Sequence, residues 1–212
     1  MKSIAIMWFR RDLRLTDNPA LTAAARHQNI LPLWIDDHAE AGDRTPGAAL
    51  RVWQHHALQA LSDSLGGRLN LRKGPAQAVF EDLAQRFDVQ AVYWNRCYEP
   101  WRMSRDAGLK SWLKDRGIQT ESFNGSLLWE PWEIHKSDGT AYRVFTPFYR
   151  NGCLAAAAPR KPLTRPDLGH VVLDSKADDL AQVLLETPDA TIIAGATDVG
   201  LWVTKFLRDI SP

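Results

Sequence analysis

Short β-rich runs alternate with amphipathic helical patterns through the first 125 residues, and this alternation constrains the fold more than any other feature. Apolar, β-branched and aromatic residues dominate the runs, which lie at residues 3–9, 30–36, 69–73, 89–95 and 119–124. Helical spacing dominates the segments between them, at residues 16–27, 45–67, 75–87 and 102–117. Strict alternation implies right-handed crossovers and a sheet covered on both faces. The sequence therefore predicts a doubly wound α/β fold: a mostly parallel, five-stranded Rossmann-like sheet with helices on both faces.

Individual residues support the helical segments. Asp17 and Asn18 are both candidate caps, and Pro19 suits a first turn because its missing N–H needs no partner there. The second helical segment ends on Gly66 and Gly67, a typical stop signal. Its apolar residues follow a helical spacing at Leu50, Trp53, Ala57, Leu58 and Leu61.

The pattern loosens after residue 125. Residues 126–177 contain a turn expected at 137–140, a short helix expected around 148–156, and a stretch rich in Pro, Arg and Lys at 158–166. We expect a domain over 1–125, an irregular linker over 126–177, and a separate segment over 178–212. The basic stretch suits either a solvated linker, which is the favoured interpretation, or contact with a DNA backbone.

Composition narrows the class of protein. The net charge of +1, with 45% hydrophobic and 24% charged residues, is typical of a soluble globular protein and gives no argument for nucleic acid by charge alone. No apolar stretch approaches the length of a membrane span, and we expect a cytoplasmic protein without a membrane partner. Cys97 and Cys153 fit neither a disulfide framework nor a zinc cluster, and His55 and His56 are interpreted as surface or packing residues.

The topology indicates where a ligand would bind. In an open parallel sheet the site lies outside the carboxyl ends of the strands, near the point where strand order reverses. The segments there are 10–12, 34–37 and 95–101. The glycine fingerprint of a dinucleotide site does not follow the first run.

Three motifs resemble one known family. "WFRRDLRLTDNPAL" (8–21), "AVYWNRCYEPW" (91–101) and "YRVFTPFYR" (142–150) resemble the DNA photolyase and cryptochrome family, in the same order and at the same separations. The resemblance covers about residues 1–175. It implies that family's N-terminal α/β domain and the beginning of its interdomain linker.

The resemblance also implies a function. Family members bind an antenna chromophore, a deazaflavin, flavin or folate, at this domain and pass its excitation to reduced FAD in a separate helical domain. The FAD then donates an electron to a pyrimidine dimer in damaged DNA. The FAD site and the dimer pocket belong to that helical domain, which this sequence does not show. We therefore expect no catalytic residue here and no repair by this chain alone.

Candidate antenna residues follow from the same resemblance: Arg11, Trp34, Asp36, Arg51, Cys97 and Glu99. Trp34 is suited to stack on a planar ring, and Arg11 to pair with an anionic group. Cys97 stands where some binders carry an acidic residue, and Trp101-Arg102 replaces the Asn-Glu of folate-binding members, which disfavours folate. The alternatives are an empty pocket, and a structural salt-bridge cluster of Arg10, Arg11 and Arg14 with Asp12.

The last segment has a different character. Residues 178–212 resemble the start of the FAD-binding domain of the xanthine dehydrogenase small subunit, with a flavin-phosphate-like loop at Gly195, Thr197, Asp198 and Gly200. We expect a fusion and a short βα tail without a working site, whereas a native C-terminal element is the alternative.

Three functional hypotheses remain from the sequence. The first is a light-harvesting photolyase-like domain, and the second is a cryptochrome-type light-sensing or partner-binding module. The third and least favoured is a flavin-binding fragment of a molybdenum hydroxylase.

Overall fold

The computed structural model describes residues 1–44 and 47–179. The expected tail loop, with Gly195, Thr197, Asp198 and Gly200, lies outside the described residues. The elements follow one another in chain order as β1 (Ser3–Phe9), α1 (Pro19–Ala24), β2 (Asn29–Asp36), the 3-10 segment η1 (His38–Arg44), α2 (Ala48–Ser64), β3 (Asn70–Lys73), α3 (Ala76–Arg86), β4 (Asp88–Asn95), α4 (Pro100–Asp115), β5 (Gln119–Phe123), α5 (Phe145–Pro147), the π-helical turn η2 (Phe148–Cys153) and β6 (His170–Val171).

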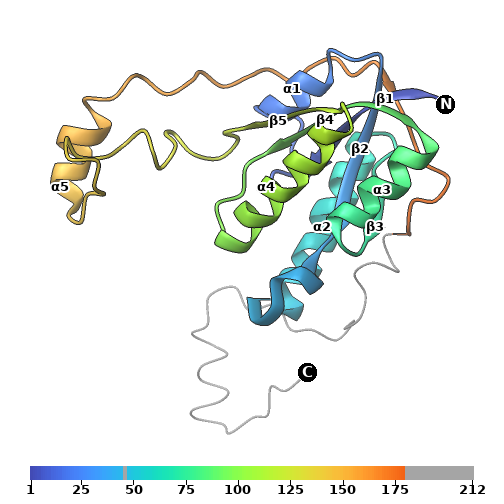
Figure 1. Ribbon diagram of the computed structural model, residues 1–212, viewed down its shortest axis with the longest axis horizontal. Coiled ribbons are helices and arrows are strands. Elements are labelled where there is room, and N and C mark those ends of the chain that lie inside the picture. The colour runs from blue at the N-terminus through green and yellow to red at the C-terminus, as the bar shows by residue number, and fades with distance from the viewer. Residues whose placement is uncertain (45–46, 180–212) are drawn as a thin grey trace, which may run out of the picture.

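The sheet confirms the predicted α/β fold. Its strands run in the order β3-β2-β1-β4-β5, and every neighbouring pair is parallel (Figure 1). The chain moves outward from β1 in one direction through β2 and β3, and in the other through β4 and β5. Strand order therefore reverses between β1 and β4, which places the expected ligand crevice above the centre of the sheet.

Helices cover both faces of the sheet, as predicted. Side chains of β1 point alternately to the two faces, so each face needs an apolar layer of helices to bury them. Met7 and Phe9 belong to a core that includes residues of α1 and α2, such as Leu21 and Leu58. The next residue along, Trp8, is fully buried in the other core. That core draws on α3 and α4 through residues that include Phe80, Leu83, Leu109 and Leu113.

A sixth strand departs from the predicted five. β6 pairs in parallel with the start of β2, where Asn29 faces His170. The side chain of Asn70, at the first position of β3, holds the segment that follows β6: its Nδ2 donates to Val172 O at 2.9 Å, and its Oδ1 accepts from Asp174 N at 2.6 Å. A two-residue strand is too short to show hydrophobic periodicity, so no sequence pattern predicts it.

The linker makes an excursion and then returns. From residue 124 the chain runs out to a lobe around α5, which projects from the α/β body, and comes back to pair with β2 (Figure 1). The predicted turn is present, with Gly139 at φ 78° and Asp138 Oδ1 accepting from Thr140 N at 2.9 Å. The expected helix at 148–156 begins earlier than predicted, as α5, and continues as the π-helical η2.

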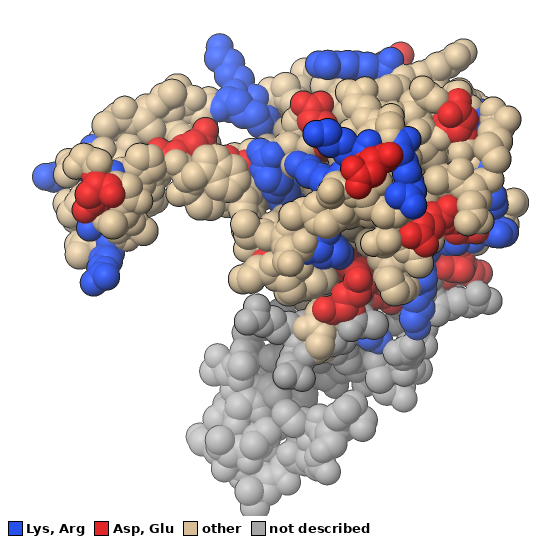
Figure 2. All heavy atoms as spheres, in the orientation of Figure 1, with Lys and Arg blue, Asp and Glu red and all other residues tan. Residues whose placement is uncertain are grey.

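The basic stretch at 158–166 is held to the α/β body rather than simply solvated. Arg160 pairs with Asp17 at 2.5 Å, and Arg165 Nη2 donates to Ser64 O at 3.2 Å. Acidic and basic side chains lie next to one another over the α/β body on the face drawn in Figure 2. Within the described part of the chain, no helix is long and apolar enough to cross a membrane.

Candidate functional site

A pocket of about 550 Å³ opens at the carboxyl ends of β1 and β2, where the topology predicted a ligand site. The loop after β1 forms one side, and α2 with the start of α4 closes the others. Its described lining consists of Arg10, Arg11, Leu13, Arg14, Trp34, Ile35, Asp37, His38, Leu50, Trp53, Gln54, Ala57 and Arg102. We call it the arginine pocket, because four of these side chains are guanidinium groups.

Apolar surface faces these arginines across the pocket. Trp53 and Leu50 project from α2 with 67% and 50% of their surface exposed, an unusual state for large apolar side chains on the same helical stripe as buried Leu61. Trp34 lies deeper and is only 2% exposed. The exposed ring surface that a planar ligand would meet therefore belongs mainly to Trp53.

Two of the arginines are buried. Arg10 donates to Asn95 O and pairs with Asp106, yet its Nε has no hydrogen-bond partner among the described residues. Arg102 is 8% exposed, and its Nε is likewise unpartnered there. Its acceptors are distant: Nη1 donates to Cys97 Sγ at 3.7 Å and lies 3.7 Å from Glu99 Oε1, and Nη2 lies 3.9 Å from Asp37 Oδ1. A buried guanidinium with long contacts has capacity for an added anion.

Arg11 occupies the mouth of the pocket. Its Nη1 lies 2.9 Å from Glu99 Oε1, while most of the Arg11 side chain is exposed. An exposed ion pair contributes little to stability, so little opposes a rotation of Arg11 toward an anion. Glu99 thus holds the guanidinium near the entrance.

Asp36 lies just behind the pocket with His38. His38 Nδ1 is 2.6 Å from Asp36 Oδ1, and both side chains are buried. Burial opposes ionisation of Asp36, but the hydrogen bond from His38, and more weakly the nearby Arg51, keep the pKa of this carboxyl below its usual value. The pair fixes the turn from β2 into η1, which carries the pocket residue His38.

The structure therefore brings together some of the predicted antenna residues. Arg11 and Trp34 line the pocket, Glu99 holds Arg11, and Asp36 supports the wall with Arg51 nearby. Cys97 faces a second, smaller cavity; burial raises the pKa of its thiol. These six assignments stay predictions.

The first loop differs in detail from the predicted salt-bridge cluster. Arg10, Arg11 and Arg14 pair with Asp106, Glu99 and Asp17 respectively. Asp12 instead accepts hydrogen bonds from Arg10 N at 2.9 Å and from the side-chain amides of Asn95 and Asn18. A buried carboxylate needs several donors, and amides supply them here without bringing a second charge.

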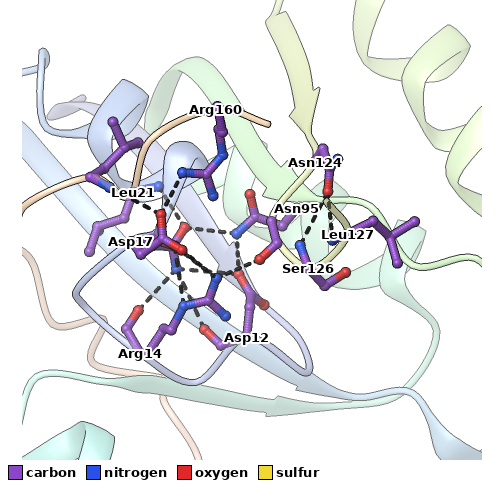
Figure 3. A network of polar contacts seen from close by, with 12 residues as sticks. Asp12, Arg14, Asp17, Leu21, Asn95, Asn124, Ser126, Leu127 and Arg160 are labelled. Atoms are coloured by element: carbon purple, nitrogen blue, oxygen red, sulfur yellow. Dashed lines mark hydrogen bonds and ion pairs between the residues drawn. The ribbon is translucent and has the colours of Figure 1, made fainter. Parts of the chain in front are cut away.

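Asn95, at the end of β4, organises this loop (Figure 3). Its Nδ2 donates to Asp12 and to Asn18 Oδ1, and its Oδ1 accepts from Ala20 N at 3.3 Å. Of the two cap candidates, Asn18 is the one that caps α1, and its Oδ1 accepts from Leu21 N at 3.1 Å. The network holds the loop that carries Arg11 and Arg14 at the rim of the pocket.

Arg14 and Asp17 extend the network to the start of the linker and to its returning part around Arg160 (Figure 3). Arg14 Nη2 donates to Gly125 O and to Asp17 O, and the Asp17 carboxylate accepts from Arg160 and from Leu163 N at 3.1 Å. The pocket rim and the linker are therefore attached to the same loop.

Sequence reasoning missed several pocket residues, among them Leu50, Trp53, Gln54 and Arg102 as parts of the site. The first two followed the core-like spacing of α2, and only the position of the sheet beneath that helix shows which of its turns are uncovered. Within the described residues, no group of three or more His, Cys, Asp and Glu side chains is arranged to hold a metal ion.

Comparison with known proteins gives consistent results. The DNA photolyase family model matches residues 5–167. The deoxyribodipyrimidine photo-lyase of Agrobacterium fabrum is 44% identical over 170 residues, which are 76% of this chain and 35% of that protein. Cryptochrome-2 of Arabidopsis thaliana is 39% identical over 159 residues, covering 73% of this chain and 26% of its own.

Solved structures agree. The bacterial class III photolyase from Agrobacterium tumefaciens has a TM-score of 0.79 at 38% identity, covering 89% of this chain and 40% of its own. The archaeal photolyase from Sulfolobus tokodaii, solved with two FAD molecules, has a TM-score of 0.73 at 26% identity, covering 98% of this chain and 46% of its own. The chain spans about a third of the length of the first of these curated relatives. It belongs to the DNA photolyase and cryptochrome family and corresponds to that family's N-terminal α/β domain.

Proposed function

We propose that this chain is a light-harvesting domain and that the arginine pocket binds its antenna chromophore. One observation carries the proposal: the buried Arg102 guanidinium, with an unpartnered Nε, and the exposed ring of Trp53 line the same pocket at the carboxyl edge of the sheet. A planar chromophore with an anionic group satisfies both features. Its ring would lie on Trp53 and Leu50, and its anion would meet Arg11 and Arg102.

A flavin or deazaflavin suits the pocket better than a folate. Trp101 and Arg102 occupy the positions of the Asn-Glu pair expected for folate binding, and Arg102 contributes a cation to the pocket instead of a carboxylate. The Sulfolobus photolyase was solved with two FAD molecules, which implied a novel light-harvesting cofactor in that protein. When bound, such a chromophore would supply absorption of near-UV or blue light.

The wider role is part of the same proposal. Relatives named as deoxyribodipyrimidine photo-lyases support light-driven repair of pyrimidine dimers in damaged DNA, by a protein in which this domain serves an FAD bound elsewhere. Relatives named as cryptochromes support a light-sensing role as the second candidate. We further propose the division into a domain at 1–125 and a linker at 126–177, with the flavin-domain-like tail of 178–212 as a separate segment.

Titration with riboflavin 5′-phosphate tests the pocket directly, because binding quenches flavin fluorescence near tryptophan. We expect saturable binding by the full chain, and at least tenfold weaker binding by Trp53→Ala and by Arg11→Met. Arg26→Met, an exposed arginine on the connection from α1 to β2, is the matched control and should bind as the parent does. Undiminished affinity in both pocket variants would show that the flavin binds elsewhere.

A further inference from the structure

A second cavity, of about 170 Å³, lies at the carboxyl ends of β4 and β5 and shares no described lining residue with the arginine pocket. One face of α4 forms a wall, through Met103, Asp106, Ala107 and Lys110, which recur at helical spacing. Trp94 of β4 lies beneath, and Trp132 of the linker contributes the opposite side. We call it the lysine cavity.

Its charges are balanced with one exception. Arg96 is neutralised by Glu130, whose Oε1 lies 2.9 Å from Nε and 2.6 Å from Nη2. Asp106 is shared between Arg10 and Arg105, the latter at 2.8 Å. Both of these cavity residues therefore carry compensated charges.

Lys110 is the exception. Its Nζ donates to Ser122 Oγ at 2.7 Å, and no carboxylate among the described residues lies within ion-pair distance of it. Burial, and then repulsion by Arg96, lower the pKa of this half-buried amine. Asp106 and Glu121 attract the amine only from beyond ion-pair distance, and an anion in the cavity would add a direct counter-charge that offsets the repulsion by Arg96.

Apart from its charged groups, the lysine cavity is lined by aromatic rings, and its volume is small. Lys110 Nζ lies 5.7 Å from the centroid of the Trp94 ring, and the Arg96 guanidinium lies 5.8 Å from that of Trp132. Trp132 is more than half exposed, so ring surface is available for contact. The volume is below the roughly 300–1,000 Å³ of sites for drug-sized ligands. A single substituted ring fits these dimensions, whereas a tricyclic chromophore does not.

We propose that the lysine cavity binds a small aromatic carboxylate, with the carboxylate on Lys110 and the ring against Trp132. The lysine cavity is a separate space from the arginine pocket, because no described residue lines both, although the Arg10–Asp106 ion pair joins their walls. The Lys110 amine favours an anion over a neutral molecule, and the Trp132 ring favours a planar molecule over an aliphatic one.

Benzoate and its neutral analogue benzamide test the proposal on the full chain, followed by the backbone amide shifts of Ala107 and Ser122. We expect benzoate to shift both signals saturably and benzamide to bind at least tenfold more weakly. Lys110→Met should weaken benzoate binding at least tenfold. Lys114→Met, an exposed lysine one turn further along α4, is the control and should leave binding unchanged.

A second variant keeps the test decisive if Lys110→Met folds poorly. Trp132→Ala changes an exposed linker side chain, should fold as the parent does, and should also weaken benzoate binding. Equal affinity for benzoate and benzamide would overturn the proposal. So would benzoate shifts confined to the arginine pocket, or affinity unchanged by either cavity variant.

Discussion

Arg86 donates a hydrogen bond from Nη2 to Asp174 Oδ2 at 2.7 Å and so joins α3 to the returning linker, 88 positions later in the chain. Asp174 is buried and also accepts from Arg72 Nη1 at 3.1 Å. Asp82 accepts from both arginines in turn, and Lys176 lies 3.2 Å from it. This ionic cluster, rather than the two-residue β6 alone, holds the linker against the edge of the sheet.

Replacing Asp174 by Asn should loosen that attachment. The change removes a charge from between two partly buried guanidinium groups, which then share only Asp82. We expect the free energy of unfolding to fall by about 1–3 kcal/mol in urea titrations. Asp167→Asn, an exposed linker aspartate, should change it by less than about 0.5 kcal/mol. A loss no larger than that of the control would mean that β6 and Asn70 alone are enough to hold the linker against the sheet.

The same cluster should make stability sensitive to acid. Burial opposes ionisation of Asp174 and Asp82, but hydrogen bonds, from Arg86 above all, hold the pKa of each carboxyl below its usual value. A lowered folded-state pKa stabilises the fold above the unfolded pKa of about 3.9, and this stability is lost as pH falls through the folded-state value.

We therefore expect the free energy of unfolding to fall below about pH 4, and to fall less steeply in Asp174→Asn. Urea titrations at intervals from pH 6 down to pH 2 measure both slopes. Parallel slopes would show that Asp174 has an ordinary pKa in the folded chain.

The sequence predicted the elements that form from residues close together in the chain, and it missed an element that depends on hydrogen bonds from a distant residue. β1 was expected at 3–9 and spans Ser3–Phe9, because a central strand buried on both faces is a continuous apolar run. β6 was missed because Asn70, a hundred residues earlier, supplies the hydrogen bonds that hold the chain beside it.

The same division holds for the site. Parallel topology alone collects the carboxyl ends of strands, so it placed Arg11 and Trp34 at one pocket. The role of Trp53 depends on how much of α2 the sheet covers. Trp53 lies on the same helical stripe as buried Leu61, and spacing alone cannot separate a core position from a pocket wall.

Gly125 should not tolerate a side chain. A Cβ there would lie 2.5 Å from Asn95 Cγ, at the point where the linker leaves β5 and where Arg14 binds Gly125 O. Because Asn95 is fixed by its own hydrogen bonds, Gly125→Ala should cost about 1–3 kcal/mol of unfolding free energy.

Gly108→Ala is the matched control, since a Cβ there meets nothing within 4 Å and the residue lies inside α4. It should raise stability by about 0.5–1 kcal/mol. The unfolding midpoints of the two variants, measured by heat or urea, should therefore shift in opposite directions. Stabilisation by Gly125→Ala would show that the Asn95 side chain moves aside at little cost.

Asn95→Asp should introduce repulsion at the centre of the loop network without changing its shape. The Asn95 amide donates to the Asp12 carboxylate, so a carboxylate in its place would face another carboxylate in a buried site. We expect a loss of about 2–4 kcal/mol at pH 7, because a donor is lost and a like charge is added. The loop that carries Arg11 and Arg14 should loosen as well, which would weaken flavin binding at the arginine pocket.

The pH dependence separates repulsion from simple loss of packing. Two carboxyl groups in contact raise the pKa of one of them, and its protonation restores a donor between the pair. A raised folded-state pKa gives stability at low pH that is lost as pH rises, so the deficit of Asn95→Asp should be smaller at pH 5 than at pH 7. Asn29→Asp, at an exposed hydrogen bond to Ser3 O, should show a small deficit at both values. A deficit in Asn95→Asp that does not change with pH would mean that shape, and not charge, makes the amide necessary at this position.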